Sequence, residues 1–118
     1  QLEQTEGRAA SPGIRVVILV PTRELCTQVR NQMKDLLYYC ETITLMALSG
    51  DINRSEEIPH LKECPTILVS TPTRLVEHLK AGVIQLNSSL QTLVIDEADL
   101  VLSYGYEDDV TALIAFLP

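Results

Sequence analysis

Four short apolar runs divide the chain and have the character of buried β-strands. They cover residues 15–20, 43–48, 66–70 and 92–95. Val, Ile and Leu dominate these runs, and β-branched side chains favour the extended conformation. A short run with few polar residues is typical of a strand that is covered on both faces. The pattern therefore predicts a sheet that lies inside the molecule.

Between these runs the apolar residues follow a helical period. From Leu25 to Cys40 they recur every three or four positions, which predicts an amphipathic helix over residues 23–39. A second helix is expected over residues 53–64, where Pro59 should interrupt or kink it. Two further helices are expected over residues 73–81 and 110–117.

Strands and helices thus alternate along the chain, and this alternation predicts the fold class. It is typical of an α/β protein, with a parallel sheet, flanking helices and right-handed crossovers. Residues 1–13 are polar and hold two of the five glycines, so we expect a lead-in or loop there. The domain is then expected to occupy residues 14–118.

A parallel sheet of this kind brings the carboxyl ends of all its strands to one edge. Ligands of open α/β sheets bind at that edge. The residues that directly follow the four predicted strands are Pro21-Thr22, Ser49-Gly50, Thr71-Pro72 and Asp96-Glu97. The topology therefore predicts that four distant segments form a single site.

The last of these segments carries carboxylates. Asp96 and Glu97 come directly after an apolar strand, where their oxygens can hold Mg²⁺ and orient a water molecule. Acidic residues are also common in the first turn of a helix, so the pair could instead be an ordinary helix start.

Two of the other segments combine a hydroxyl, a proline and an arginine at a helix start. Thr22 and Pro21 suit a helix start, but Arg23 lies at the end that the helix dipole disfavours for a cation. Thr71, Pro72 and Arg74 repeat this chemistry after another strand. An arginine beside free helix amides is well placed to bind a phosphate.

Composition limits the partners that this site can have. The net charge is −7, and no basic residue follows Lys80, which argues against a broadly basic surface for nucleic acid. Any nucleic acid is therefore expected to bind locally, through helix amides and a few arginines. The three cysteines are odd in number and not closely paired, which indicates reduced thiols in an intracellular protein. No apolar run is long enough to cross a membrane.

Taken in order, these motifs resemble those of a known family. Pro-Thr-Arg-Glu-Leu at 21–25, Ser-Gly at 49–50, Thr-Pro-Thr-Arg at 71–74 and Val-Ile-Asp-Glu-Ala-Asp at 94–99 resemble the DEAD-box RNA helicases. The resemblance implies ATP and Mg²⁺ as cofactors and RNA as the partner. It also implies part of the first of two RecA-like domains, of the P-loop NTPase type.

The resemblance implies roles for individual residues. Asp96 would contact Mg²⁺ through water and Glu97 would position the attacking water. Asp99 would link the nucleotide site to other motifs. The residues implied to touch the RNA sugar-phosphate backbone are Pro21, Thr22, Arg23, Gly50, Thr71 and Arg74.

The chain also departs from the family pattern. Ser49 and Thr73 stand where the family usually has glycine, and each adds a side chain near the implied RNA path. The stretch at residues 99–107 resembles a nucleolar branch that is linked to assembly of the large ribosomal subunit. This implies a nuclear or nucleolar location and ribosome-assembly factors as partners.

One family motif does not occur in these residues. No Gly-x-x-x-x-Gly-Lys-Ser/Thr segment is present, so the phosphate-binding loop is missing here. We therefore expect an internal piece of a larger enzyme, which alone neither hydrolyses ATP nor unwinds RNA. We also expect marginal stability and an exposed strand edge.

Three other classes of protein are alternatives to an RNA helicase. A signalling receiver domain needs an acidic pair after the first strand and a late lysine, and both are missing. A non-catalytic RNA-binding or scaffold module of the same fold stays open, although the intact Asp96-Glu97 pair argues against it. A DNA helicase also stays open, because backbone contacts alone do not distinguish RNA from DNA.

Overall fold

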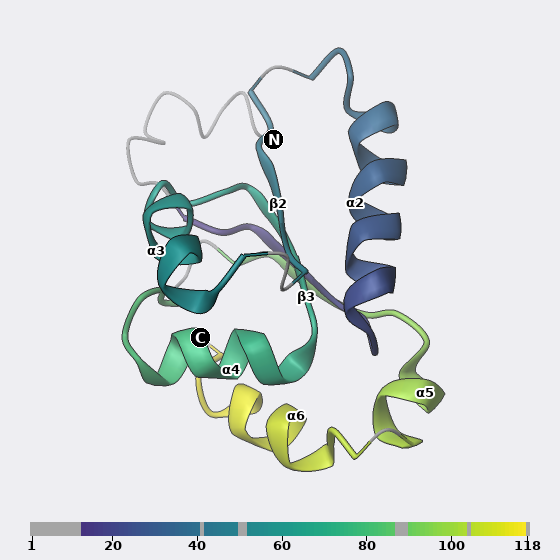
Figure 1. Ribbon diagram of the computed structural model, residues 1–118, viewed down its shortest axis with the longest axis vertical. Coiled ribbons are helices and arrows are strands. Elements are labelled where there is room, and N and C mark those ends of the chain that lie inside the picture. The colour runs from purple at the N-terminus through teal and green to yellow at the C-terminus, as the bar shows by residue number, and fades with distance from the viewer. Residues whose placement is uncertain (1–12, 41, 50–51, 87–89, 104, 118) are drawn as a thin grey trace.

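A four-stranded parallel sheet forms the centre of the molecule (Figure 1). The computed structural model describes residues 13–40, 42–49, 52–86, 90–103 and 105–117. Within them the strand order is β2-β3-β1-β4. The strands are β1 (Val16–Leu19), β2 (Leu45–Leu48), β3 (Ile67–Ser70) and β4 (Thr92–Ile95). The predicted fold class, an α/β protein with a parallel sheet and flanking helices, is therefore confirmed.

Helices cover both faces of this sheet. One face carries α2 (Arg23–Leu36), and the other carries α3 (Arg54–Lys62), α4 (Pro72–Lys80) and α6 (Glu107–Ile114). The short helix α5 (Ala98–Ser103) follows β4 directly. Figure 1 shows α4, α5 and α6 gathered at the lower end of the molecule, where α2 also begins.

Alternating side chains of the strands build two apolar layers. On one face, Val20 and Val69 pack against Cys26 of α2. On the opposite face, Val17, Leu19 and Leu68 belong to a larger apolar cluster. That cluster also takes Leu61 from α3, Leu75, Val76 and Leu79 from α4, and Leu113 from α6. The core is aliphatic, as the composition predicts for a chain with one Phe and no Trp. None of the helices in the described residues has the length and apolarity needed to span a bilayer.

The helix starts follow from local capping chemistry. The Thr22 side chain accepts a hydrogen bond from the Leu25 amide at 3.1 Å, and Asn53 and Glu56 form a reciprocal capping box at the start of α3. Pro72 occupies the first turn of α4, where its missing N–H costs nothing. These local features fix where α2, α3 and α4 begin.

Some helix boundaries differ from the expected ones. The first helix ends at Leu36 rather than at residue 39, and α3 continues through Pro59 without interruption. The last helix begins at Glu107, three residues before the apolar stretch from which it was predicted. The expected polar lead-in at residues 1–13 lies almost wholly outside the described residues.

Candidate functional site

The four carboxyl strand ends lie side by side in register. Leu19 of β1 pairs with Ser70 of β3 and with Ile95 of β4, and Leu48 of β2 pairs with Ser70. The Val20 amide then donates to the Ser70 carbonyl at 3.0 Å, and the Asp96 amide donates to the Leu19 carbonyl at 2.8 Å. The residues that follow these strands therefore leave the sheet at a common edge, as the topology predicts.

At the end of β1, the predicted residues differ in how much surface they expose. Pro21 is buried, Thr22 is partly buried and caps α2, and Arg23 is exposed in the first turn. The Pro21 carbonyl accepts a hydrogen bond from the Tyr106 hydroxyl at 3.0 Å. Arg23 is thus the member of this motif that is most accessible to a ligand.

At the end of β3, Thr71 begins α4 without capping it through its side chain. Only 6% of Thr71 is exposed, and its carbonyl accepts a hydrogen bond from the Ser70 hydroxyl at 2.7 Å. The Thr71 backbone also hydrogen-bonds the Cys26 thiol. Burial raises the pKa of Cys26 to about 12, and this hydrogen bond opposes that shift only in part.

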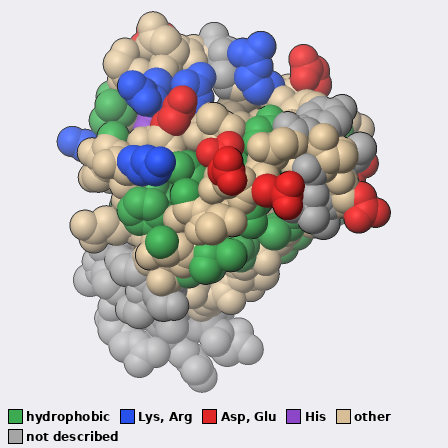
Figure 2. Space-filling model, turned by 90° about the horizontal axis from the view of Figure 1, so that it is seen from below, with side chains coloured by type: hydrophobic (Ala, Val, Ile, Leu, Met, Phe, Trp, Pro, Cys, Tyr) green, Lys and Arg blue, Asp and Glu red, His purple; other side chains and the backbone are tan. Residues whose placement is uncertain are grey.

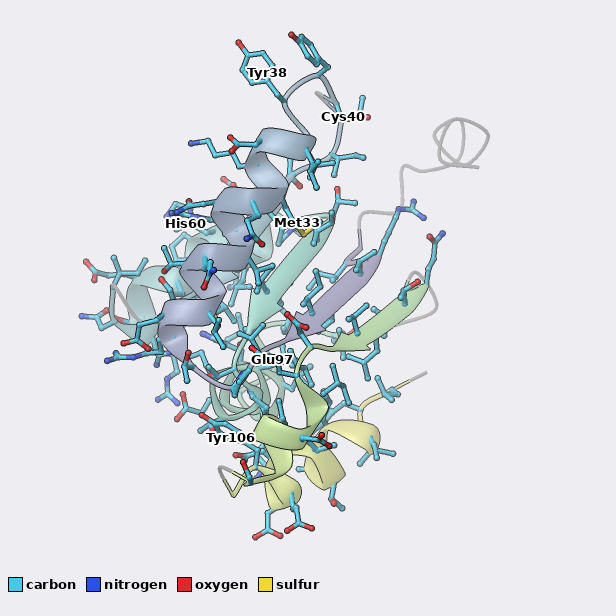
Figure 3. The ribbon with its side chains drawn as sticks, turned by 90° about the vertical axis from the view of Figure 1, so that its right-hand side faces the viewer. Met33, Tyr38, Cys40, His60, Glu97 and Tyr106 are labelled. Carbon is cyan, nitrogen blue, oxygen red and sulfur yellow. The ribbon has the colours of Figure 1, made fainter. Side chains whose placement is uncertain are left out.

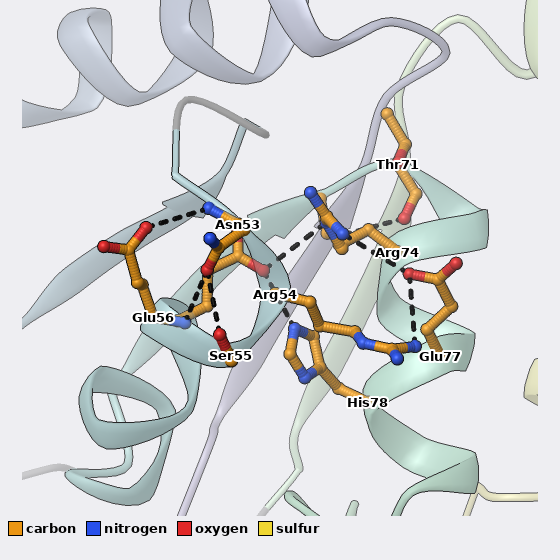
Figure 4. A network of polar contacts seen from close by, with 10 residues as sticks. Asn53, Arg54, Ser55, Glu56, Thr71, Arg74, Glu77 and His78 are labelled. Atoms are coloured by element: carbon orange, nitrogen blue, oxygen red, sulfur yellow. Dashed lines mark hydrogen bonds and ion pairs between the residues drawn. The ribbon is translucent and has the colours of Figure 1, made fainter.

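Arg74 does not stand free at the start of α4. Its Nε lies 3.4 Å from Oε1 of Glu57 on α3, and its Nη1 lies 3.5 Å from Oε1 of Glu77. The same Oε1 of Glu57 lies 2.9 Å from Nε2 of His78 (Figure 4). Arg54 extends this network with a longer contact of 3.9 Å to Glu77.

At the end of β4, the carboxylates face solvent. Asp96, Glu97 and Asp99 are exposed, and no hydrogen bond or ion pair engages their carboxylates within the described residues. Glu97 has a φ of 53°, a left-handed conformation that side chains other than glycine rarely adopt. Figure 3 shows Glu97 where β4 passes into α5, at the end of the sheet away from Tyr38.

This acidic strand end suits Mg²⁺ bound together with a nucleotide. Mg²⁺ prefers oxygen ligands and keeps several waters, so one or two carboxylates plus phosphates hold it. The oxygens of Asp96 and Glu97 are of that kind. No group of three or more metal-ligating side chains occurs in the described part of the chain, so these residues form no closed metal cage.

Several contacts at this edge were not predicted from the sequence. The Thr73 hydroxyl donates to Oδ2 of Asp109 at 2.6 Å, which links the starts of α4 and α6. Tyr106 links the loop between α5 and α6 to Pro21, and Glu57 links α3 to α4. Gly50, which the resemblance places at the RNA, lies outside the described residues.

Charge is unevenly distributed around this end of the molecule. Figure 2 views the molecule from below, the side on which Figure 1 shows α4, α5 and α6. Basic side chains lie toward one side of this view and acidic side chains extend toward the other. In the sequence, all six acids from Asp96 to Asp109 follow the last basic residue, Lys80.

Comparison with known proteins assigns this chain to a family. The model of the DEAD/DEAH box helicase family matches residues 2–118. A parallel sheet that gathers helix starts and a strand-end carboxylate pair at one edge is the arrangement of a nucleotide-binding α/β domain. The chain belongs to the DEAD/DEAH box helicase family, and its fold is that of a RecA-like domain.

Individual relatives agree with this assignment. The chain is 49% identical over 107 residues to "Probable ATP-dependent RNA helicase ddx56" of Dictyostelium discoideum, which covers 90% of the chain. It is 40% identical over 119 residues to "ATP-dependent RNA helicase DBP9" of Eremothecium gossypii, covering 98% of the chain. The chain spans only 16% and 20% of the lengths of these two relatives.

A solved structure supports the fold. The crystal structure of the yeast DEAD-box splicing factor Prp28 superposes with a TM-score of 0.81 at 30% sequence identity. The match covers 90% of this chain and 24% of that chain.

Proposed function

We propose that this chain is part of an ATP-dependent RNA helicase that couples ATP hydrolysis to RNA binding and local separation of RNA strands. The observation that carries the proposal is the common edge, at which Arg23, Arg74 and the Asp96-Glu97 pair follow three neighbouring parallel strands. Phosphate-binding groups and a carboxylate pair are thereby held in one rigid frame. Such an arrangement suits a protein that senses RNA and nucleotide together.

In this proposal the acidic end of β4 serves the nucleotide. Asp96 would hold Mg²⁺, and Glu97 would position the water that attacks the γ-phosphate. Asp99 connects this site to the rest of the domain. Bound Mg²⁺ would supply neutralisation of the phosphate charge. The exposed carboxylates of Asp96 and Glu97 support the roles of these two residues, because neither is already engaged by a described residue.

RNA would bind along the starts of α2 and α4. Arg23 is exposed and Arg74 keeps 23% of its side chain exposed, so both can reach a phosphate. Thr22, Pro21 and Thr71 offer less surface, and their part is to shape the backbone beside these arginines. We assign Gly50 the same role from the family pattern alone. Thr73 is turned to Asp109, which limits how far its side chain intrudes on the RNA.

Strand separation needs a second RecA-like domain, which we propose as the partner of this edge. Binding of ATP would close the two domains over bent RNA, and hydrolysis would release the product. A role in ribosome assembly and a nucleolar location are proposed from the stretch at residues 99–107. Imaging of a tagged full-length protein with a nucleolar marker tests the location, and exclusion from the nucleolus would contradict it.

RNA-stimulated ATP hydrolysis tests the proposed activity. The full-length protein and its Glu97→Gln variant are compared with Mg²⁺ and a duplex RNA, and residues 1–118 alone serve as a control that we expect to be inactive. The substitution keeps the shape of the side chain and removes its charge, so it should abolish turnover and leave RNA binding intact. Equal rates in the two proteins, or RNA binding without any turnover, would favour the non-catalytic binding module.

A further inference from the structure

We infer that Glu57 is a positioning residue for RNA binding: it fixes the guanidinium of Arg74 at the start of α4, and His78 in turn fixes Glu57. The inference rests on the proposed RNA-binding role of Arg74. It assigns a function to α3, which otherwise carries no residue of the site. Figure 4 shows Arg74, Glu77 and His78 of α4 turned toward the first turns of α3.

The burial of Glu57 calls for an explanation. Glu57 is 1% exposed and His78 is 0% exposed, and they meet at 2.9 Å between Oε1 and Nε2. A carboxylate withdrawn from water is costly unless charged or hydrogen-bonding partners surround it. An apolar residue at this position would avoid the cost. The buried acid is thus better explained by what it does for its neighbours than by its effect on stability.

His78 fixes the orientation of the Glu57 carboxylate. Its Nδ1 is buried and has no hydrogen-bond partner among the described residues, so the Nε2 side makes the only polar contact of the ring there. With its proton on Nε2, the imidazole donates to Oε1 of Glu57. The same Oε1 of Glu57 contacts Arg74, so the hydrogen bond from the rigid imidazole ring of His78 fixes the position of that oxygen.

Glu57 contacts the guanidinium of Arg74 at Nε, the nitrogen nearest to the aliphatic part of the side chain. Oε1 of Glu57 contacts Nε at 3.4 Å and Glu77 contacts Nη1 at 3.5 Å, while Nη2 has no such contact in the described part of the chain. A planar guanidinium that is anchored at Nε presents its outer nitrogens in a fixed direction. Contacts that kept Arg74 away from RNA would occupy both outer nitrogens, whereas Glu77 contacts Nη1 and leaves Nη2 without a contact in the described part of the chain. The geometry thus points to orientation of Arg74 for a phosphate.

Variants of the full-length protein test this inference through RNA affinity. Glu57→Met keeps the length of the side chain and removes both carboxylate oxygens, so RNA should bind about tenfold more weakly. Glu57→Gln keeps one oxygen acceptor and should restore part of that loss. Fluorescence anisotropy with a labelled single-stranded RNA measures the Kd. Glu63→Met is the matched control, because Glu63 is an exposed acid next to the end of the same helix, and it should bind as wild type.

A double-mutant cycle separates positioning from a general loss of structure. If Glu57 acts through Arg74, Glu57→Met should weaken RNA binding in the wild type but not further in an Arg74→Ala background. In each single variant, the slope of log Kd against the logarithm of the salt concentration should also fall, by about the amount that one phosphate contact contributes. Additive losses in the double variant would overturn the inference.

The kinetics and the controls distinguish the possible failures. We expect Glu57→Met to raise the RNA concentration that gives half-maximal ATPase activity and to leave kcat unchanged at saturating RNA. A fall in kcat alone would also overturn the inference. If Arg74→Ala binds RNA as tightly as wild type, the proposed RNA contact itself fails. If Arg74→Ala weakens binding while Glu57→Met does not, only the positioning role fails.

A second variant covers the case in which Glu57→Met does not fold. His78→Phe keeps a ring in the buried site and removes the hydrogen bond to Glu57. It should weaken RNA binding by a smaller factor, and again only while Arg74 is present. Unchanged affinity in a folded His78→Phe protein would contradict the part of the inference that concerns His78.

Discussion

Glu97 combines a strained backbone with the most important proposed chemical role. Its φ of 53° lies in the left-handed region, which costs a residue with a Cβ roughly 1 kcal/mol. Such conformations persist where the surrounding structure or function requires them. Here the left-handed turn lets the chain leave β4 and enter α5 at once, so Glu97 is held at the sheet edge.

This strain predicts opposite effects of one substitution on stability and activity. Glu97→Gly should raise the free energy of unfolding by about 1 kcal/mol relative to Glu97→Ala, because only glycine adopts the left-handed conformation freely. Both variants should lose ATPase activity. Urea unfolding of the two variants measures the difference. Equal unfolding free energies would show that residue 97 is not strained in solution.

The buried thiol of Cys26 gives a second prediction at the residue scale. Burial raises its pKa from 9.0 to about 12, so the folded protein holds this proton more tightly than the unfolded chain. The associated stability is complete below pH 9 and is lost as the pH rises toward 12. At pH 8 iodoacetamide should modify the exposed Cys40 first and Cys26 only after unfolding. Mass spectrometry of the alkylated peptides checks the order, and early labelling of Cys26 would contradict it.

At the scale of elements, one hydrogen bond ties α6 to α4. The Thr73 hydroxyl donates to Asp109, and the pair is exposed, so its loss should cost only about 0.5–1 kcal/mol. Thr73→Val and Asp109→Ala each remove one partner of this hydrogen bond and should each destabilise by this amount, and the double variant should cost little more than either single one. Thermal unfolding of the four proteins measures the coupling. Fully additive losses would mean that the pair does not interact.

The elements themselves were largely predictable, because their signals are local. Periodicity predicted α2, and runs of Val, Ile and Leu predicted the strands. The register that aligns Leu19, Ser70 and Ile95 follows from parallel topology, so the common edge was predictable as well. The short helix α5 was missed, since six residues are too few to show a period.

The contacts between elements were not predictable. Glu57 and His78 are 21 positions apart, and nothing local tells which faces of α3 and α4 meet. From the sequence, Arg74 was predicted to be a free cation, because its partner Glu57 lies on another helix. The same holds for Tyr106 and Pro21, which are 85 positions apart. Such pairs depend on the rotation of each helix about its axis, which packing determines.

At the scale of the whole molecule, β4 is the least protected strand of the sheet. It is the last strand in the order β2-β3-β1-β4, and Val94 and Ile95 are 40% and 37% exposed. The strands in the middle of the sheet, β1 and β3, have buried or half-buried side chains throughout. An exposed, apolar strand at the edge of a sheet tends to pair with another chain.

This edge predicts concentration-dependent association of residues 1–118 when they are prepared alone. Val94→Lys places a charge on the exposed strand and should shift the protein toward the monomer, because pairing would bury the unpartnered ammonium. Ile114→Lys is the matched control, since Ile114 is a similarly apolar residue that is 58% exposed on α6 rather than on the sheet. Sedimentation velocity over a range of concentrations measures the association. A wild-type monomer at all concentrations, or equal effects of the two lysines, would show that the β4 edge does not drive association.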